Sequence, residues 1–419
     1  MSKLIIRGGK KLSGEITLAG MKNAATPIMA AALLTEEECF LDNLPQISDV
    51  LRMLDILKSL GAEVERTGGR GVRICAKNID LSKIDRKAIK AMRSSVLLLG
   101  PLLSRCGEVE LPEPGGCIIG NRPLDTHLFA LGELGAEISR SSAGYRIKGG
   151  GLKSATIILP EFSVTATENA LMAAILLPGK TIIKMAAAEP HVQDLILFLS
   201  QMGAKIRGGG THTLEIEGVE KLHGARHKII PDQIEAGTFA ALAAVTRGAI
   251  TIRGVNFEHL DAIISVLRRA GVNLEKGDDW IAISPANPLS AFKLQALPYP
   301  GFPTDLQAPF GVLATQARGT SLIHDPLFEG RMGYVGELVK MGANAVVCDP
   351  HRVLISGPTP LYGTEIKSLD LRAGATMVIA GLVAEGETII NEAEVLDRGY
   401  ENLDERLRAL GADITKINA

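Results

Sequence analysis

The chain has 419 residues, of which 46% are hydrophobic and 22% charged. This is the balance of a soluble globular protein with two or three domains. Its net charge of −2 gives no electrostatic reason to bind nucleic acid or an anionic membrane surface. No apolar run is long enough to cross a bilayer, and the basic start, Met1–Lys11, is not followed by the apolar core of a signal peptide.

The five cysteines are few and scattered, and no two form a Cys-x-x-Cys pair. Their odd number argues against a disulfide framework or a zinc site and favours a reduced, cytoplasmic environment. The motifs of phosphate loops, dinucleotide sites and zinc proteases do not occur either. We therefore expect no metal and no cofactor.

The predicted elements repeat along the chain, beginning with a helix that is buried on every side. The segment 24–34 is rich in alanine and apolar nearly all round, which predicts such a helix. Most segments of this type are followed by a glycine and a short strand-like run. The further segments lie at 95–103, 169–177, 237–245, 308–317 and 374–383.

A second pattern, a Leu/Met-Gly-Ala-like triplet, marks the end of an amphipathic helix between the buried ones. In the fourth copy, apolar residues at 260, 263, 264 and 267 follow the helical spacing i, i+3, i+4, i+7. The glycine supplies a left-handed residue that stops the helix, and a strand begins after it. The triplets recur every 68 to 74 residues, at Gly61, Gly135, Gly203, Gly271, Gly342 and Gly411.

Six units of about 70 residues are too large for a thin solenoid. Three units that close around buried central helices make one domain of ordinary size. The sequence thus predicts an α/β protein of two such domains, with a ligand cleft between them.

Lys22 and Asn23 lie between a predicted strand at 15–18 and the first buried helix. A lysine and an amide at a helix N-terminus meet an anionic ligand with charge, hydrogen bonds and the helix dipole together. From the residues alone, an ordinary capped helix with a surface lysine is an equal alternative.

Cys117 lies in a glycine- and proline-rich loop, residues 111–127, that has neither helical nor strand periodicity. A cysteine at such a loop is expected to be accessible, and Arg122 is placed to lower its pKa or to hold a phosphate. Long loops of this kind are typical of lids and binding loops. The plain alternatives are a free surface thiol, and capping or solvation of the next helix by Asp125 and His127.

Asp305 precedes another buried helix, so the residues alone favour a helix cap, although the same place suits a general base. Three arginines, Arg93, Arg372 and Arg398, lie near helix starts, where the dipole and the guanidinium both favour an anion. With Arg331, they predict a concentration of positive charge around one cleft.

These features together resemble the enolpyruvyl transferases, the EPSP synthase-like family. The resemblance covers essentially the whole chain and rests on the sixfold unit, the Lys22–Asn23 pair and the segment around Asp305. The motif Pro-Gly-Gly-Cys-x-Ile-Gly-x-Arg-Pro-x-Asp-x-His, at 114–127, is similar to the branch that acts on UDP-N-acetylglucosamine, and every fixed position matches. The shikimate-phosphate branch shares the architecture but lacks this loop.

The resemblance implies a two-domain inside-out α/β barrel of six βαβαββ repeats, three per domain around buried helices. One domain would be residues 22–229 and carry the Cys117 loop. The second would combine 1–21 with 230–419, and the active site would lie in the interdomain cleft.

The implied reaction is an addition followed by an elimination. The 3′-hydroxyl of UDP-N-acetylglucosamine adds to C2 of phosphoenolpyruvate while C3 gains a proton, and phosphate then leaves. By the same resemblance, Cys117 donates the proton to C3 and is the group that fosfomycin alkylates, Asp305 handles the hydroxyl proton, and Lys22 completes the catalytic set. This is the first committed step of peptidoglycan precursor synthesis.

Both substrates are small molecules, and the resemblance implies a set of residues for each. Neither nucleic acid nor a membrane is implied as a partner, and the oligomeric state stays open. The phosphoenolpyruvate set is Lys22, Asn23, Arg122, Arg331, Arg372 and Arg398. The sugar-nucleotide set is Arg93, Arg122, Pro123, Leu124, Asp125, Thr126, Ser163, Val164, Thr165, Asp305 and Leu327.

Five positions depart from the family pattern, mostly on the nucleotide side or flanking the site. Thr165 stands where the pattern has glycine, and Glu161 stands where a lysine is frequent; the others are Met21, Gln233 and Gly330. Two alternatives to the implied reaction therefore stay open. One is enolpyruvyl transfer to shikimate 3-phosphate, and the other is a catalytically silent paralogue that binds a sugar nucleotide.

Overall fold

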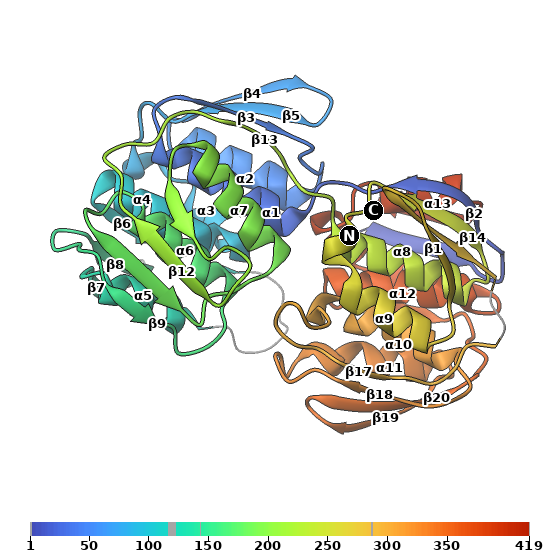
Figure 1. The fold of residues 1–419 in the computed structure, drawn as a ribbon. Coiled ribbons are helices and arrows are strands. Elements are labelled where there is room, and N and C mark those ends of the chain that lie inside the picture. The colour runs from blue at the N-terminus through green and yellow to red at the C-terminus, as the bar shows by residue number, and fades with distance from the viewer. Residues whose placement is uncertain (1, 116–122, 143, 286–287, 419) are drawn as a thin grey trace. The chain divides into compact units, whose positions relative to one another are not determined.

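The computed structural model describes residues 2–115, 123–142, 144–285 and 288–418. The chain divides into two compact units. The central unit comprises the described residues between 20 and 230. The terminal unit combines residues 2–19 with the described residues from 231 to 418 and so contains both ends of the chain (Figure 1). The assignment of the Cys117 loop to one domain lies outside the described residues.

The described residues form six small sheets, three in each unit, and five of these share one four-stranded topology. In the sheet β9-β10-β12-β11, the first pair is parallel and the other two pairs are antiparallel. The same order recurs in β13-β3-β5-β4, β2-β14-β16-β15, β17-β18-β20-β19 and β21-β22-β1-β23. The sixth sheet, β6-β8-β7, has this order without a parallel strand among the described residues. The repeat predicted from the sequence is therefore confirmed.

The strands are short, and residues on their two faces differ in burial with the period of two expected for a sheet that covers a core. In β10, for example, Thr181 and Ile183 are buried while Lys180 and Lys184 are exposed. The strands of the central unit are β3 (Glu38–Asp42), β4 (Glu63–Gly68), β5 (Gly71–Cys75), β6 (Glu108–Leu111), β7 (Glu137–Ser141), β8 (Gly144–Lys148), β9 (Thr156–Ile158), β10 (Lys180–Lys184), β11 (Lys205–Arg207), β12 (Thr213–Glu217) and β13 (Arg226–Lys228).

The terminal unit is built from strands at both ends of the chain. They are β1 (Ser2–Arg7), β2 (Ser13–Thr17), β14 (Ala249–Arg253), β15 (Asn273–Lys276), β16 (Trp280–Ser284), β17 (Lys293–Gln295), β18 (Gly319–His324), β19 (Asn344–Asp349), β20 (Arg352–Gly357), β21 (Glu365–Lys367), β22 (Glu387–Asn391) and β23 (Asp413–Asn418). β1 lies between β22 and β23 and is antiparallel to both, so the first strand of the chain completes the sheet of the last repeat.

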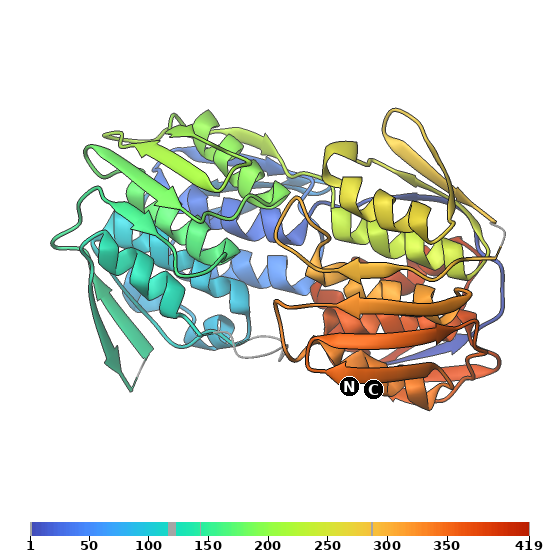
Figure 2. The ribbon, with the colours of Figure 1, turned by 60° about the horizontal axis from the view of Figure 1, so that its bottom comes forward.

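The predicted buried helices form the centre of each unit. In the terminal unit, α8 (Gln233–Val245), α10 (Gln307–Thr315) and α12 (Leu371–Val383) pack against one another, and nearly all their residues are buried (Figure 2). In the central unit the corresponding helices are α1 (Lys22–Ala31), α4 (Leu99–Cys106) and α6 (Val164–Ala174). Their small residues allow the close approach that a core poor in aromatic side chains requires.

In each repeat an amphipathic helix connects two strands of the same sheet, and each triplet glycine ends one of these helices as predicted. All six triplet glycines have positive φ, between 78° and 103°. These helices are α2 (Ser48–Ser59), α5 (Asp125–Glu133), α7 (Pro190–Gln201), α9 (Asp261–Arg269), α11 (Tyr334–Lys340) and α13 (Leu403–Ala409), and a short helix α3 (Arg86–Lys90) follows β5. Within the described residues, none of the helices combines the length and apolar character of a membrane span.

One buried segment differs from the continuous α-helix predicted at 95–103. It begins as a 3-10 helix, η3 (Arg93–Leu98), and becomes α4 at Leu99. The reason is the side chain of Asn169, which donates to the carbonyl of Val96 (3.0 Å) and accepts from the N–H of Gly100 (2.7 Å). The amide therefore replaces the backbone bond that these two residues would share in an α-helix. A side chain at Gly100 would meet the backbone of Asn169, at 2.4 Å from its carbonyl oxygen.

We expect Asn169→Ala to lower the free energy of unfolding of the central unit by about 3 kcal/mol, because it removes the acceptor of the buried Gly100 N–H and one of the two donors to the Val96 carbonyl, the other being the N–H of Leu99. Urea unfolding followed by circular dichroism measures this loss. The control is Asn78→Ala, an exposed position of the same unit, where a change within about 0.5 kcal/mol is expected. Equal effects of the two substitutions would contradict the role of Asn169.

Candidate active site

Lys22 is the first residue of α1 and forms a buried ion pair with a residue that the sequence did not single out. Its Nζ lies 2.8 Å from Oδ2 of Asp49, and the side chains are 12% and 2% exposed. Asp49 lies in the first turn of α2, where the helix dipole favours a carboxylate. Its Oδ1 is also 3.6 Å from Nη1 of Arg52. One buried carboxylate is thus shared by two cations, which leaves one positive charge in this group.

A second group of residues in the central unit brings together segments predicted to bind the sugar nucleotide. Arg93, the first residue of η3, donates from Nη2 to the carbonyl of Pro123 (3.2 Å). Thr126 donates from Oγ1 to Oε1 of Glu161 (2.9 Å), and Nε2 of His127 is 2.8 Å from Oγ1 of Thr165. These contacts place the start of η3 beside the start of α5, and the start of α5 beside the start of α6.

The predicted helix 125–134 is α5, but neither Asp125 nor His127 caps it through its side chain within the described residues. Asp125 is the first helical residue and is exposed. His127 is 3% exposed and faces α6 instead of solvent. Capping was therefore wrong for both residues and solvation was wrong for His127, whereas Asp125 is a solvated side chain in the first turn of the helix.

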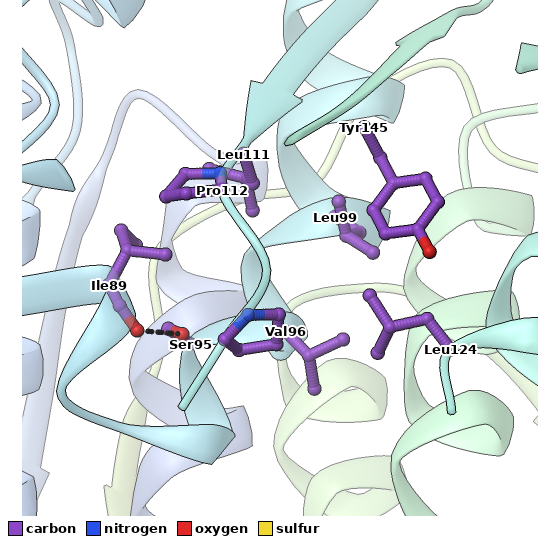
Figure 3. A pocket seen from close by; sticks show the side chains of 9 residues that line it. Ile89, Ser95, Val96, Leu99, Leu111, Pro112, Leu124 and Tyr145 are labelled. Atoms are coloured by element: carbon purple, nitrogen blue, oxygen red, sulfur yellow. Dashed lines mark hydrogen bonds between the residues drawn. The ribbon is translucent and has the colours of Figure 1, made fainter. Parts of the chain in front are cut away.

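Cys117 and Arg122 lie outside the described residues, but the segments on either side of them are described. Leu111 and Pro112 on one side and Leu124 on the other line a small apolar cavity together with Val96 and Tyr145 (Figure 3). Its volume of about 10 Å³ holds no more than one water, and its apolar lining offers no partner for one. The cavity is a small packing gap between the segments on either side of residues 116–122, and it is too small for a substrate.

In the terminal unit, Asp305 is held by the two arginines that the sequence predicted as anion ligands. Its Oδ1 is 2.7 Å from Nη1 of Arg331, and its Oδ2 accepts from Nε of Arg372 at 3.1 Å. Burial alone would raise the pKa of Asp305, but the charges and hydrogen bonds of the two arginines outweigh it and hold that pKa well below its usual range. Asp305 is therefore ionised in this arrangement.

The residues alone favoured a helix cap for Asp305, and the structure shows this to be wrong. Asp305 lies in the 3-10 helix η5 (Thr304–Leu306), and α10 begins two residues later without a side-chain cap among the described residues. Its carboxylate points instead to Arg331 in η6 (Arg331–Gly333) and to Arg372 in the first turn of α12. The cap interpretation failed because the sequence does not show which helix starts come together in space.

Two further polar side chains, neither singled out from the sequence, fix the segments around this group. Asp325 is fully buried and accepts from Oγ1 of Thr304 (2.5 Å) and from the N–H of Leu327 (3.0 Å). Gln307 donates to the carbonyl of Arg331 (3.1 Å). Only their position near Asp305 and Arg331 in the sequence could have pointed to them. Leu327 itself is exposed.

The remaining predicted residues are placed as follows. Asn23 is the second residue of α1 and half-buried, and Ser163 precedes α6 as its N-cap residue, with Val164 as the first helical residue. Arg398 ends the 3-10 helix η7 (Ala393–Arg398), a few residues before α13. Each of these lies at the start of a helix or just before one, as the sequence predicted for Asn23 and Arg398; α6 begins earlier than the buried helix predicted at 169–177 and so brings Ser163 and Val164 to a helix start.

Arg372 also connects Asp305 to the start of α8. Its guanidinium carbon is 5.4 Å from the ring centre of Tyr400, whose hydroxyl is 3.0 Å from Oγ1 of Thr238 in α8. Asp232 caps α8 by accepting from the N–H groups of Ile234 and Glu235. Burial raises the pKa of Asp232 to about 6, against the lowering effect of Arg372 and the cap hydrogen bonds. The arginine pair therefore lies among buried carboxylates that differ in acidity.

This difference predicts a pH effect. A carboxyl group whose pKa is higher in the folded protein than in the unfolded chain loses stabilising free energy as pH rises from about 4 to about 6. Asp232→Asn keeps the cap acceptor but cannot ionise. As pH rises over this range, the free energy of unfolding of the variant should therefore increase relative to that of the wild type, by up to about 3 kcal/mol. Urea unfolding at pH 4, 5.5 and 7 measures the gain. Asp85→Asn, at an exposed cap of α3, is the control, and parallel curves for wild type and Asp232→Asn would contradict the prediction.

Comparison with known proteins gives the same result from the sequence and from the structure. The family model of EPSP synthase (3-phosphoshikimate 1-carboxyvinyltransferase) matches residues 6–407. The UDP-N-acetylglucosamine 1-carboxyvinyltransferase of Koribacter versatilis is 45% identical over 420 residues, covering 100% of this chain and 97% of that protein. The enzyme of the same name from Magnetococcus marinus is 46% identical over 418 residues and is covered, like this chain, to 100%.

Among solved structures, the enolpyruvyl transferase NikO from Streptomyces tendae has a TM-score of 0.91 at 26% identity, covering 100% of this chain and 99% of that one. The EPSP synthase of Acinetobacter baumannii, with a TM-score of 0.77 and 19% identity over 100% of both chains, shares the fold. These neighbours confirm the predicted fold class, the two-domain inside-out α/β fold. From the family match over nearly the whole chain and the full-length relatives, we conclude that this chain belongs to the EPSP synthase family of carboxyvinyl (enolpyruvyl) transferases.

Proposed function

We propose that this protein transfers the enolpyruvyl group of phosphoenolpyruvate to the 3′-hydroxyl of UDP-N-acetylglucosamine and releases phosphate. The observation that carries the proposal is the 45–46% identity, over the full length, to enzymes named for this transfer. The net charge of the chain is −2, so two anionic substrates require local positive charge. Lys22, Arg93 and Arg372 supply such charge at helix starts. We place the reaction in the cytoplasm, as the first committed step of peptidoglycan precursor synthesis.

Phosphoenolpyruvate carries a phosphate and a carboxylate, and each unit offers a cationic group for them. Lys22 shares Asp49 with Arg52, and two arginines share Asp305. Two cations and one carboxylate leave one positive charge in the Asp49 group, and in the Asp305 group as long as the nearby Asp232 is protonated; an anionic substrate neutralises this charge. Asn23, Arg122 and Arg398 complete the proposed phosphoenolpyruvate set.

The chemistry needs a proton donor for C3 and a base for the hydroxyl. In the addition, a bond forms between the sugar oxygen and C2 while Cys117 delivers a proton to C3. In the elimination, C3 loses a proton and the bond from C2 to the phosphate oxygen breaks. Asp305 takes the hydroxyl proton.

A carboxylate held by two guanidiniums is a weak base, because both stabilise its ionised form. We therefore propose that Asp305 becomes basic only when the substrate takes over one of its arginines. The phosphate or carboxylate of phosphoenolpyruvate competes for Arg331 or Arg372, and the carboxylate that loses this partner binds a proton more readily. In this way, binding of phosphoenolpyruvate prepares the base for the hydroxyl of the sugar nucleotide.

Phosphate release from phosphoenolpyruvate tests the proposal. We expect release that depends on UDP-N-acetylglucosamine and stops after treatment with fosfomycin. Release with shikimate 3-phosphate in place of the sugar nucleotide would assign the chain to the other branch of the family. Binding of the sugar nucleotide without any turnover would identify a silent paralogue.

Cys117→Asp is the matched variant for the fosfomycin arm of this assay. A carboxylic acid still donates a proton, so part of the activity should remain, but it lacks the thiolate that the inhibitor alkylates. Rapid inactivation of this variant by fosfomycin would show that another group is alkylated.

The ion pair of Lys22 predicts an effect of Asp49 on the reaction. Asp49→Asn keeps the size of the side chain and one acceptor oxygen but removes the charge that holds the ammonium group, and misplacement of such a group costs about 10- to 100-fold in rate. We expect a loss of this size in kcat/KM for phosphoenolpyruvate. Asp80→Asn, which removes an exposed ion pair with Lys83 in the same unit, should leave the kinetics unchanged. Equal activity of the two variants would show that Asp49 does not position Lys22.

A further inference from the structure

Two side-chain hydrogen bonds join the first turn of α5 to α6 and to the segment just before it in the central unit. Thr126 donates to Glu161 (2.9 Å), and His127 is bonded to Thr165 (2.8 Å). Within the described residues, neither helix start is capped by a side chain. Their first N–H groups are therefore not used by caps from this part of the chain.

Hydrogen bonds connect three segments in a ring: the start of η3 with the start of α5, α5 with α6, and α6 with η3. The bond between His127 and Thr165 is the link between α5 and α6. Arg93 at the start of η3 holds the carbonyl of Pro123, just before α5. Asn169 connects α6 back to η3 and α4, because its amide bonds Val96, Gly100 and the carbonyl of Thr165 (3.0 Å). In the last link of the ring, from α5 to α6, the helices pack against each other, and the hydrogen bonds among the described residues are made by side chains. These bonds fix how the two helix starts are spaced within that packing.

Burial makes this link costly to break. His127 is 3% and Thr126 is 6% exposed, whereas their partners Thr165 and Glu161 are half-buried and exposed, so the penalty of a lost partner falls on the two buried side chains. A buried polar group that loses its partner costs the full penalty of its desolvation. A glycine at 165, as in the family pattern, offers no hydroxyl, so the constraint comes from the residue that this chain has there.

We infer that His127 and Thr165 are positioning residues for the sugar nucleotide: their bond sets the distance between segments 123–126 and 163–165. Resting on the proposed function, this inference adds two side chains that act through the spacing of the ligand segments. Neither Lys22 nor Asp305 is part of the ring. Breaking the bond should therefore weaken binding of the sugar nucleotide and leave phosphoenolpyruvate and the chemical step largely unaffected.

The test compares Thr165→Val, which removes the hydroxyl at constant shape, with Thr165→Ser, which keeps it. For Thr165→Val we expect the KM and the calorimetric Kd for UDP-N-acetylglucosamine to rise about tenfold, as for the loss of one buried hydrogen bond. KM for phosphoenolpyruvate and kcat should stay within about twofold. Thr165→Ser should bind like the wild type.

Thr181→Val is the matched control. Thr181 is a buried threonine of β10 in the same unit, and its hydroxyl has no partner in the described part of the chain. The same substitution there should leave Kd, KM and kcat unchanged. His127→Phe should reproduce the effect of Thr165→Val, and the double variant should lose no more than either single variant, because both remove one bond.

Two results would overturn the inference: an unchanged Kd for UDP-N-acetylglucosamine in Thr165→Val, or an equal loss in KM for both substrates and in kcat, which is the sign of a merely structural role. Wild-type turnover decides the proposed function separately. If the wild type binds UDP-N-acetylglucosamine without turning it over, the proposed function fails, and the Kd values of the two Thr165 variants still decide the inference. A wild type that does not bind this ligand overturns both.

Discussion

The helices at the centre of each unit are buried on all sides, and this constraint governs where polar groups can lie. Because these helices are shielded from solvent, a polar side chain among them must form its hydrogen bonds within the protein. The threonines of the central helices do so locally, since Thr167, Thr238 and Thr376 each donate to the carbonyl four residues before. Asn169 reaches a neighbouring helix and takes the place of a backbone hydrogen bond. Charged side chains are therefore expected at the ends of these helices.

Both units have the same arrangement of charged side chains near the end of a buried helix. Asp49 in one unit and Asp305 in the other are carboxylates that two cations share. In a single buried ion pair the carboxylate neutralises the cation, which then has little net charge with which to attract an anionic ligand. Sharing one carboxylate between two cations keeps them in place and leaves them short of negative charge. Such a group is stable without its ligand and still attracts an anion.

Much of the fold could be predicted because it depends on local patterns. Helices apolar all round, amphipathic helices and the glycine after each amphipathic helix are all visible within a few residues, and six copies reinforce each other. The cationic candidates were also visible, since Lys22, Arg93 and Arg372 lie at helix starts. Their partners were not, because the pairing of Lys22 with Asp49 depends on the packing of α1 against α2. The same limit made Asp305 look like a cap and hid the bond between His127 and Thr165.

The place of β1 between β22 and β23 has a consequence for synthesis on the ribosome. The central unit is essentially one stretch of chain, from 20 to 230, and is complete well before translation ends, so it is free to fold as a domain while the rest is made. The terminal unit needs β22 and β23, at 387–391 and 413–418, to cover the two edges of β1 at 2–7. β1 must therefore stay without these partners until both strands have been made, and the whole central unit lies between them in the sequence.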